Sequence, residues 1–198
     1  AARRERAKHV VFTQRRAFLL GAVGAGETID AWLTTEGTLT ARLIAHSERF
    51  RVRRLHQRSA MCLADEARTI GLPRPERVWE REVLLECDGK PAVFGHTVVP
   101  TSCTASDWPL FSALGERSLG TTLFYDPLVR RGQLESARTR GGHPLMERVR
   151  APLGGSEDSL YYARRCVYRR HQGLLLVTEV FLPEVLKLQP AKPKQNTK

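Results

Sequence analysis

One acidic residue interrupts a strongly apolar segment of the chain. The segment LLLVTEVFLP covers residues 174–183, and Glu179 is its single charged residue. A run this apolar is typical of a strand that is buried on both faces. Burying a lone carboxylate costs several kcal/mol unless the group is paired, hydrogen-bonded or protonated. We therefore expect Glu179 to be enclosed and to serve a chemical purpose.

A second charge falls on an apolar strand face in WEREVLLEC, residues 79–87. The side chains of a strand point alternately to its two faces. One face carries Glu80, Glu82 and Glu86, which predicts that this face contacts water. The other face carries Trp79, Arg81, Val83, Leu85 and Cys87. The pattern therefore predicts that Arg81 is buried among apolar side chains.

Two interpretations of these buried charges remain open. In the first, Arg81 and Glu179 form a structural salt bridge, although apolar residues of the same size stabilise a core better. In the second, they face a closed pocket, where the planar guanidinium of Arg81 binds a ligand carboxylate through two hydrogen bonds. Glu179 then meets a hydroxyl group or a transferable proton at the far end. His96, on the face of Phe94 and Val98, is more typical of a core or surface histidine than of a ligand contact.

The elements that hold Arg81 and Glu179 are predicted to be antiparallel hairpins. Asp88-Gly89 is a strong turn signal in the middle of residues 79–100, and a second hairpin turns at His171-Gln172-Gly173. The other predicted elements are strands at 48–57 and 132–140, helices at 26–37, 38–47 (N-cap Thr38), 103–115 and 118–126, and a Gly/Pro-rich connection at 141–158. Hairpin-joined strands with separately grouped helices predict a single α+β domain, in which helices cover an antiparallel sheet of about six strands.

The composition limits the possible partners. The 198 residues fit one domain, and the net charge of +11 comes mostly from arginines that are scattered along the chain. No aromatic RNA-binding signature, zinc-finger spacing or helix-turn-helix pattern accompanies them. We therefore expect a basic surface that steers small anions, and no nucleic-acid partner. No apolar stretch approaches the roughly 20 residues of a membrane span, so we expect no membrane insertion.

The four cysteines form no metal-binding or redox motif. Cys62, Cys87, Cys103 and Cys166 are widely spaced, and the histidines are dispersed, so no metal-ligand spacing appears. Reduced thiols in a cytoplasmic protein are the expected state. Residues 13–26, TQRRAFLLGAVGAG, have the formal pattern of an export signal, but an acidic residue precedes them and no convincing cleavage site follows.

Four segments, in the same order, resemble the chorismate lyase family. They are WLTTEGTLTARL (32–43), REVLLECDGKPAVFGHTVVP (81–100), ALGERSLGTTLF (113–124) and VTEVFLP (177–183). The resemblance implies a single domain over residues 12–187, with a six-stranded antiparallel sheet and an internal ligand cavity under helical flaps. It implies a cytoplasmic monomer that converts chorismate to 4-hydroxybenzoate and pyruvate, the first committed step of ubiquinone biosynthesis, without a metal or organic cofactor. We expect the basic residues 1–11 and the tail 188–198 to be disordered.

The resemblance also implies roles for individual residues. Arg81 would bind the ring carboxylate of chorismate, and Glu179 would meet the 4-hydroxyl. Backbone groups near Leu39 and Leu119 would complete the carboxylate end. His96 stands where the family usually has a second basic residue, so the enolpyruvyl carboxylate would be held differently, or only by a protonated histidine. Three roles of Glu179 remain open, which are to protonate the departing ether oxygen, to hold the 4-hydroxyl or to accept the C4 proton.

Two other functions compete with the lyase. A non-catalytic domain that binds a small anionic effector has a similar fold in some transcription regulators. Such a domain normally follows a DNA-binding domain, for which residues 1–30 are too short. A basic nucleic-acid-binding protein would instead show a steep salt dependence of binding. The 141–158 connection is longer than the family leads us to expect, and we interpret it as a surface loop rather than an extra lid.

Overall fold

The computed structural model describes residues 13–14, 28–139, 142–156 and 159–190. The expected disordered ends, residues 1–11 and most of 188–198, lie outside these ranges, as does most of the export-like segment. Leu188, in the expected tail, is buried and packs in the hydrophobic core. None of the helices in the described ranges is long and apolar enough to cross a membrane.

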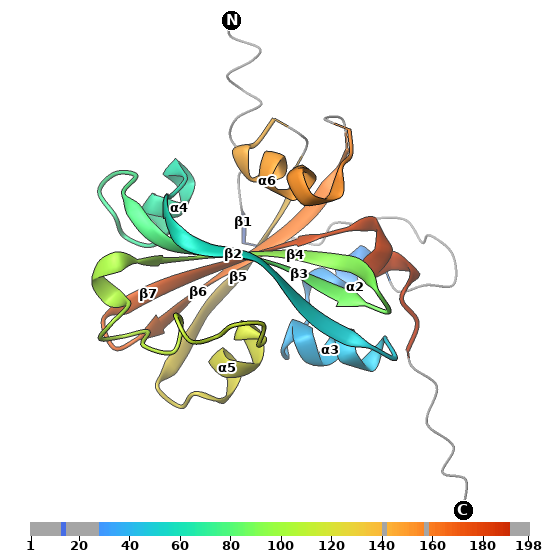
Figure 1. Ribbon diagram of the computed structural model, residues 1–198, viewed down its shortest axis with the longest axis horizontal. Coiled ribbons are helices and arrows are strands. Elements are labelled where there is room, and N and C mark those ends of the chain that lie inside the picture. Colours follow the sequence, from blue (N-terminus) through green and yellow to red (C-terminus); the bar gives the residue numbers. More distant parts are fainter. Residues whose placement is uncertain (1–12, 15–27, 140–141, 157–158, 191–198) are drawn as a thin grey trace, which may run out of the picture.

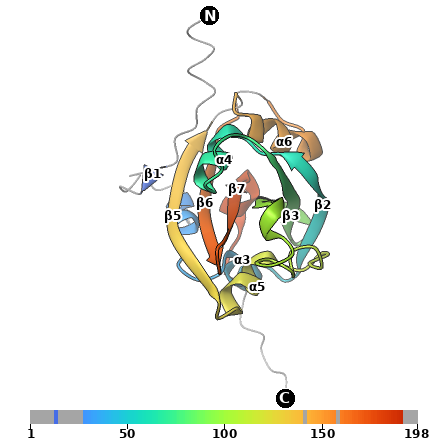
Figure 2. The same ribbon diagram turned by 90° about the vertical axis from the view of Figure 1, so that its left-hand side faces the viewer.

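One antiparallel sheet forms the centre of the molecule. Its strand order is β1-β5-β6-β7-β4-β3-β2. The strands are β1 (Thr13–Gln14), β2 (Phe50–Met61), β3 (Arg77–Cys87), β4 (Lys90–Pro100), β5 (Val129–Thr139), β6 (Tyr161–Arg170) and β7 (Gly173–Phe181). The six long strands confirm the predicted sheet, and the two-residue β1 adds a short edge beside β5. Figure 2 shows that the sheet is strongly curved, with β5 and β2 on opposite sides of the view.

Short helices cover both faces of the sheet, which confirms the predicted α+β class. They are α2 (Ile29–Leu33), α3 (Leu39–Ala45), α4 (Ala64–Thr69), α5 (Leu119–Tyr125) and α6 (Pro144–Leu153), together with the 3₁₀ turns η2 (Thr101–Cys103) and η3 (Pro183–Lys187). In Figure 1, α4 and α6 lie above the sheet, and α3 and α5 lie below it. The two pairs of helices therefore enclose different faces.

Local sequence signals explain the elements nearest to the site. Asp88 and Gly89 have φ angles of 51° and 80°, as a two-residue turn between β3 and β4 requires. Thr38 is the N-cap of α3, as predicted, and its Oγ1 accepts a hydrogen bond from the backbone N–H of Ala41 at 3.0 Å. Ser118 caps α5 in the same way through the N–H of Thr121, at 3.4 Å.

The predicted helix at 103–115 is wrong. After η2 the chain runs through turns, because Pro109 lacks an N–H donor and disfavours a helical conformation in the residue before it. Three apolar residues of this segment still pack inward, since Trp108, Phe111 and Leu114 are buried, whereas Leu110 is exposed.

The predicted loop at 141–158 is also wrong, because it contains α6. Pro144 stands in the first turn of this helix, where its missing N–H would have no helical partner anyway. The Nδ1 of His143 accepts a hydrogen bond from the N–H of Leu145 at 3.2 Å, which caps the helix. Leu145, Met146 and Val149 are buried, so α6 is part of the core rather than a surface loop.

The prediction that the face of β3 with Glu80, Glu82 and Glu86 contacts water is also wrong. Glu80 and Glu82 are 0% and 4% exposed, because α6 and the unpredicted helix α4 cover that face. The prediction counted three carboxylates as a sign of solvent. The structure instead supplies basic partners for two of them, Arg148 and His56 for Glu80 and His96 for Glu82.

Candidate functional site

An internal cavity lies between the sheet and the helices α3 and α5. It has two adjoining parts, which share the lining residues Leu39, Gly120, Leu123, Tyr168, Val177 and Glu179. We call the part that Arg81 lines, about 50 Å³ in volume, the Arg81 compartment. The part that Arg131 and Arg164 line, about 240 Å³ in volume, is the Arg131 compartment. Glu179 therefore lies at the boundary between the two.

Strand register places Arg81 and Glu179 on the same face of the sheet. Gly95 pairs with Val83 on one side and with Glu179 on the other. Arg81 is two residues before Val83 in β3, so the alternation of side chains puts it on the same face. A Cβ atom on Gly95 would lie 2.9 Å from Cγ2 of Val83. The glycine thus leaves the floor of the cavity open between the two charged residues.

Arg81 is a buried cation that forms no ion pair with any described residue. It is 2% exposed, and its Nη2 donates to the backbone oxygens of Gly115 at 3.1 Å and Arg117 at 2.9 Å. Its Nε has no hydrogen-bond partner among the described residues. Burial, with a smaller contribution from Arg54, lowers the pKa of Arg81 to about 10, so the side chain remains charged at neutral pH. A desolvated guanidinium with a free donor is suited to binding a carboxylate.

Glu179 is paired, but its partner is Arg164 rather than Arg81. The Nε of Arg164 donates to Oε2 of Glu179 at 2.5 Å, across the β6–β7 pair. Within the described part of the chain, Oε1 of Glu179 has no recorded hydrogen bond. The structural salt bridge between Arg81 and Glu179 is therefore not formed. Glu179 is half-buried rather than fully enclosed, and it presents a carboxylate oxygen to the cavity.

Arg164 also anchors the cavity wall. Its Nη1 donates to the backbone oxygens of Trp32 at 3.2 Å and Thr35 at 3.3 Å, and the side chain is 3% exposed. The guanidinium therefore has three acceptors on two separate segments. Arg164 was not predicted, although the register of the second hairpin contains the necessary information.

Leu39 and Leu119 both line the Arg81 compartment. Each is the first residue of its helix, in α3 and α5 respectively, where backbone N–H groups lack intrahelical partners. A hydrogen bond of 2.6 Å between Oγ1 of Thr40 and Oγ of Ser118 joins the two helix starts. The structure thus brings Arg81, Glu179, Leu39 and Leu119 to one cavity.

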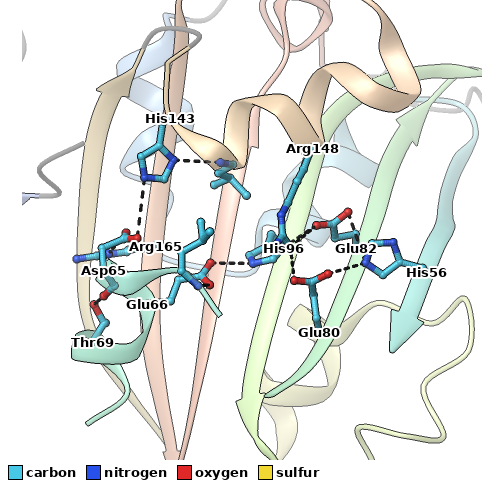
Figure 3. A network of polar contacts seen from close by, with 12 residues as sticks. His56, Asp65, Glu66, Thr69, Glu80, Glu82, His96, His143, Arg148 and Arg165 are labelled. Carbon is cyan, nitrogen blue, oxygen red and sulfur yellow. Dashed lines mark hydrogen bonds and ion pairs between the residues drawn. The ribbon is translucent and has the colours of Figure 1, made fainter. Parts of the chain in front are cut away.

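His96 is not part of this cavity. It lies on the opposite face of β4, 1% exposed, between Glu66 and Glu82 (Figure 3). Its Nε2 is 2.7 Å from Oε1 of Glu66, and its Nδ1 is 3.1 Å from Oε1 of Glu82. Burial alone would lower the pKa of His96, but the two carboxylates raise it to about 10. His96 is therefore a buried cation that already has its anions.

The same network holds a group of residues with metal-ligand chemistry. His56, Glu80 and Glu82 place their ligand atoms within 4.8 Å of one another, which no other trio of His, Cys, Asp or Glu does in the described ranges. Arg148 contacts both carboxylates, and its Nη1 lies 3.1 Å from Oε1 of Glu82 (Figure 3). The arginine supplies the positive charge that a metal ion would supply. The arrangement is that of an ion-pair network that fastens α6 to the sheet.

Comparisons with known proteins identify a family and several relatives. The chorismate lyase family model matches residues 23–189. A probable chorismate pyruvate-lyase of Cupriavidus metallidurans is 50% identical over 156 residues, which are 78% of this chain and 73% of the relative. Another from Ralstonia nicotianae is 47% identical over 168 residues, or 83% of this chain and 86% of the relative.

Solved structures show a similar fold. The effector domain of PhnF from Mycobacterium smegmatis has a TM-score of 0.55 at 15% identity, over 75% of this chain and 90% of that domain. At this identity the likeness concerns the fold alone. The matched family segment contains every described residue that lines the cavity, from Gly37 to Glu179 on β7. On this evidence the chain belongs to the chorismate lyase family.

Proposed function

We propose that this protein converts chorismate to 4-hydroxybenzoate and pyruvate. The observation that carries the proposal is Arg81, a buried guanidinium with an unpartnered Nε that shares a cavity with one carboxylate, Glu179. Chorismate has a ring carboxylate at one end and a 4-hydroxyl at the other. A cation and a hydrogen-bond acceptor on one sheet face match these two groups in kind.

In the proposed reaction, Arg81 binds the ring carboxylate and uses its free Nε as one donor. The ether bond at C3 breaks, and C4 loses its hydrogen as a proton, so the ring becomes aromatic. The departing enolpyruvate gains a proton on its methylene carbon and becomes pyruvate, which balances atoms and charge. Aromatisation supplies the driving force, so the cavity mainly orients the substrate and excludes water.

Glu179 is proposed to hold the 4-hydroxyl. Its Oε2 already accepts a hydrogen bond from the Nε of Arg164, and a second carboxylate oxygen can accept one from a hydroxyl group. The other carboxylate oxygen, Oε1, is the one that can accept this hydrogen bond, because Arg164 contacts Oε2. Of the three roles left open by the sequence, this one agrees best with a carboxylate that a guanidinium already holds in place.

The reaction is the first committed step toward ubiquinone in this family, and we propose the same place for this protein. We also propose that it acts in the cytoplasm as a monomer. The cysteines of the described chain are free thiols, and three of the four are buried, which suits a reducing compartment.

The test is an assay with chorismate. We expect equal amounts of 4-hydroxybenzoate, followed by its ultraviolet absorbance, and pyruvate. Arg81→Ala should lower kcat/KM roughly 10²- to 10³-fold, since truncating one member of a buried charged pair costs about 2–5 kcal/mol. Arg77→Ala, an exposed arginine on the same strand, is the matched control and should behave as the unmodified protein. Saturable binding of 4-hydroxybenzoate without any turnover would contradict the proposal and favour an effector-binding domain.

A further inference from the structure

Chorismate carries two carboxylates, and Arg81 accounts for one of them. The described residues that line the cavity include four with a formal charge, which are Arg81, Arg131, Arg164 and Glu179. Three arginines and one glutamate leave a net charge of +2, which equals in size the charge of the chorismate dianion. Arg164 is committed to Glu179 and to two backbone oxygens. Arg131 is the remaining cation.

A β-bulge turns Arg131 toward the cavity. In the β5–β6 pair, Arg131 lies opposite Tyr168, whereas Leu134 lies opposite Cys166. Three steps along β5 thus match two steps along β6, so one extra residue is inserted. In a regular strand Arg131 and Leu134 would point to opposite faces. The bulge puts both on the cavity face, and both line the Arg131 compartment.

Gly132 makes this bulge possible. A Cβ atom at this position would lie 2.8 Å from the backbone oxygen of Val167, and a backbone atom cannot move away as a flexible side chain can. A glycine therefore allows β5 to approach β6 closely at the point of insertion. The bulge and Gly132 together therefore fix the direction in which the side chain of Arg131 points.

The hydrogen-bond partners of Arg131 among the described residues are neutral, and Glu179 acts on it through charge alone. Its Nη1 donates to the backbone oxygen of Glu36 at 2.7 Å. None of the carboxylates in the described ranges forms an ion pair with it. The side chain is exposed, and it lies where the larger compartment meets solvent. Such a guanidinium has donors to spare for an incoming anion.

We propose that Arg131 binds the enolpyruvyl carboxylate of chorismate. This inference rests on the proposed lyase function and identifies the second anion site of the same cavity. The 4-hydroxyl of chorismate is bound at Glu179, on the boundary of the two compartments, and the enolpyruvyl ether is on the adjacent ring carbon. With the ring carboxylate at Arg81, the side chain of the substrate enters the compartment that Arg131 lines.

Arg131 should affect binding of the substrate and not binding of the aromatic product. Chorismate uses both Arg81 and Arg131, whereas 4-hydroxybenzoate has a single carboxylate and uses Arg81 alone. Loss of Arg131 therefore weakens binding of the substrate and leaves binding of the aromatic product unchanged. A structural role for Arg131, through Glu36, would affect both ligands alike.

The experiment compares Arg131→Gln, Arg131→Lys and the control Arg130→Gln. Arg130 is the adjacent exposed residue, and its Nη1 donates to the backbone oxygen of Pro127, so the control removes the same charge one residue away. For Arg131→Gln we expect KM for chorismate to rise roughly tenfold, as for the loss of a hydrogen bond to a charged group, with kcat little changed. Arg131→Lys should recover part of the loss, and Kd for 4-hydroxybenzoate should stay within about twofold in every variant.

Three outcomes decide the matter. An unchanged KM in Arg131→Gln, or an equal rise in Arg130→Gln, overturns the second anion site while the lyase function stands. A parallel loss of 4-hydroxybenzoate binding shows that Arg131 shapes the cavity, and this also overturns the proposal. If the unmodified protein does not turn over chorismate at all, the proposed function itself fails, and the failure is recognised before any variant is made.

Discussion

Three consecutive residues of β3 separate two kinds of buried charge. Arg81 points into the cavity, and its neighbours Glu80 and Glu82 point to the opposite face of the sheet. On that opposite face the carboxylates meet the cations Arg148 and His96 and the imidazole of His56, so the buried negative charge has cationic partners. On the cavity side, positive charge exceeds negative charge. Matched buried charges hold elements together, whereas unmatched ones indicate where a ligand must supply the balance.

The largest effect should come from the matched face. His96→Leu keeps a similar volume but leaves the buried carboxylates of Glu66 and Glu82 short of a cation, which should lower the free energy of unfolding by about 3–5 kcal/mol. Denaturant titration measures the loss, and affinity for 4-hydroxybenzoate in the folded fraction should not change. His56→Leu is the control, because His56 contacts the same network but is partly exposed, so its cost should be smaller. If His96→Leu instead lost affinity for 4-hydroxybenzoate and kept its full stability, the two faces would not have these separate roles.

The next effect should come from the pair on the cavity side. Glu179→Gln keeps the shape, weakens the contact with Arg164 and should lower kcat/KM roughly 10- to 100-fold, since hydrogen bonds to charged groups contribute about 1.5–3 kcal/mol. Glu135→Gln removes a comparable pair with Arg165, whose Nε lies 2.7 Å from Oε2 of Glu135 and outside the cavity. Steady-state kinetics should show no change in that control. Equal turnover in both variants would exclude any proton-transfer role of Glu179.

A third effect, spread over several pH units, should be the pH dependence of stability. The pKa of His96 is about 10 in the folded protein against an ordinary value of 6.5, so its stabilisation is complete below pH 6.5 and is lost as the pH rises toward 10. The pKa values of Glu66 and Glu82 lie below the ordinary 4.5, because His96 outweighs the opposing effect of burial, so their contribution is lost as the pH falls below 4.5.

Stability should therefore be greatest between pH 4.5 and 6.5 and decline above this range by up to about 1.4 kcal/mol per pH unit. Thermal unfolding at a series of pH values measures the decline. Arg148 and His56 face the same carboxylates, so the His96→Leu variant is needed to isolate the histidine. A variant with the same slope as the unmodified protein would assign the decline to other groups.

The sequence predicted the strands and the burial of Arg81 because both follow from local patterns, whereas Glu179 is less enclosed than expected. Asp88-Gly89 is sufficient to define a hairpin, and strict alternation along β3 is sufficient to place Arg81 among apolar residues. Leu39 and Leu119 came from family resemblance, and the structure places both at the same cavity. Their exact roles stay predictions.

The partner of Glu179 required register, which is not a local property. The second hairpin has a two-residue turn, so Arg170 pairs with Gly173 and Arg164 with Glu179. A three-residue turn, as predicted, would have moved Arg165 opposite Glu179. One residue in a turn thus decides which arginine enters the site.

The environment of Glu80 and Glu82 required knowledge of the covering helices. A proline in the first turn of α6 and a short polar α4 both resemble loop sequence. Without these helices, the most economical interpretation of the carboxylates was a wet surface. The sequence left His96 either as a core or surface histidine or as a contact for the enolpyruvyl carboxylate, and the structure places it away from the cavity, between two anions that were not foreseen.

Guanidinium groups on three other elements hold the backbone around α2, in addition to the core packing of its apolar side chains. Arg42 of α3 donates to the oxygen of Ala31, Arg164 of β6 to those of Trp32 and Thr35, and Arg131 of β5 to that of Glu36. A five-residue helix has too few internal bonds to persist alone. Its opening would break the contacts of Arg164 and disturb the cation that holds Glu179. Local unfolding of this wall and loss of the site are therefore one cooperative event, and the segment cannot fluctuate independently of the chemistry.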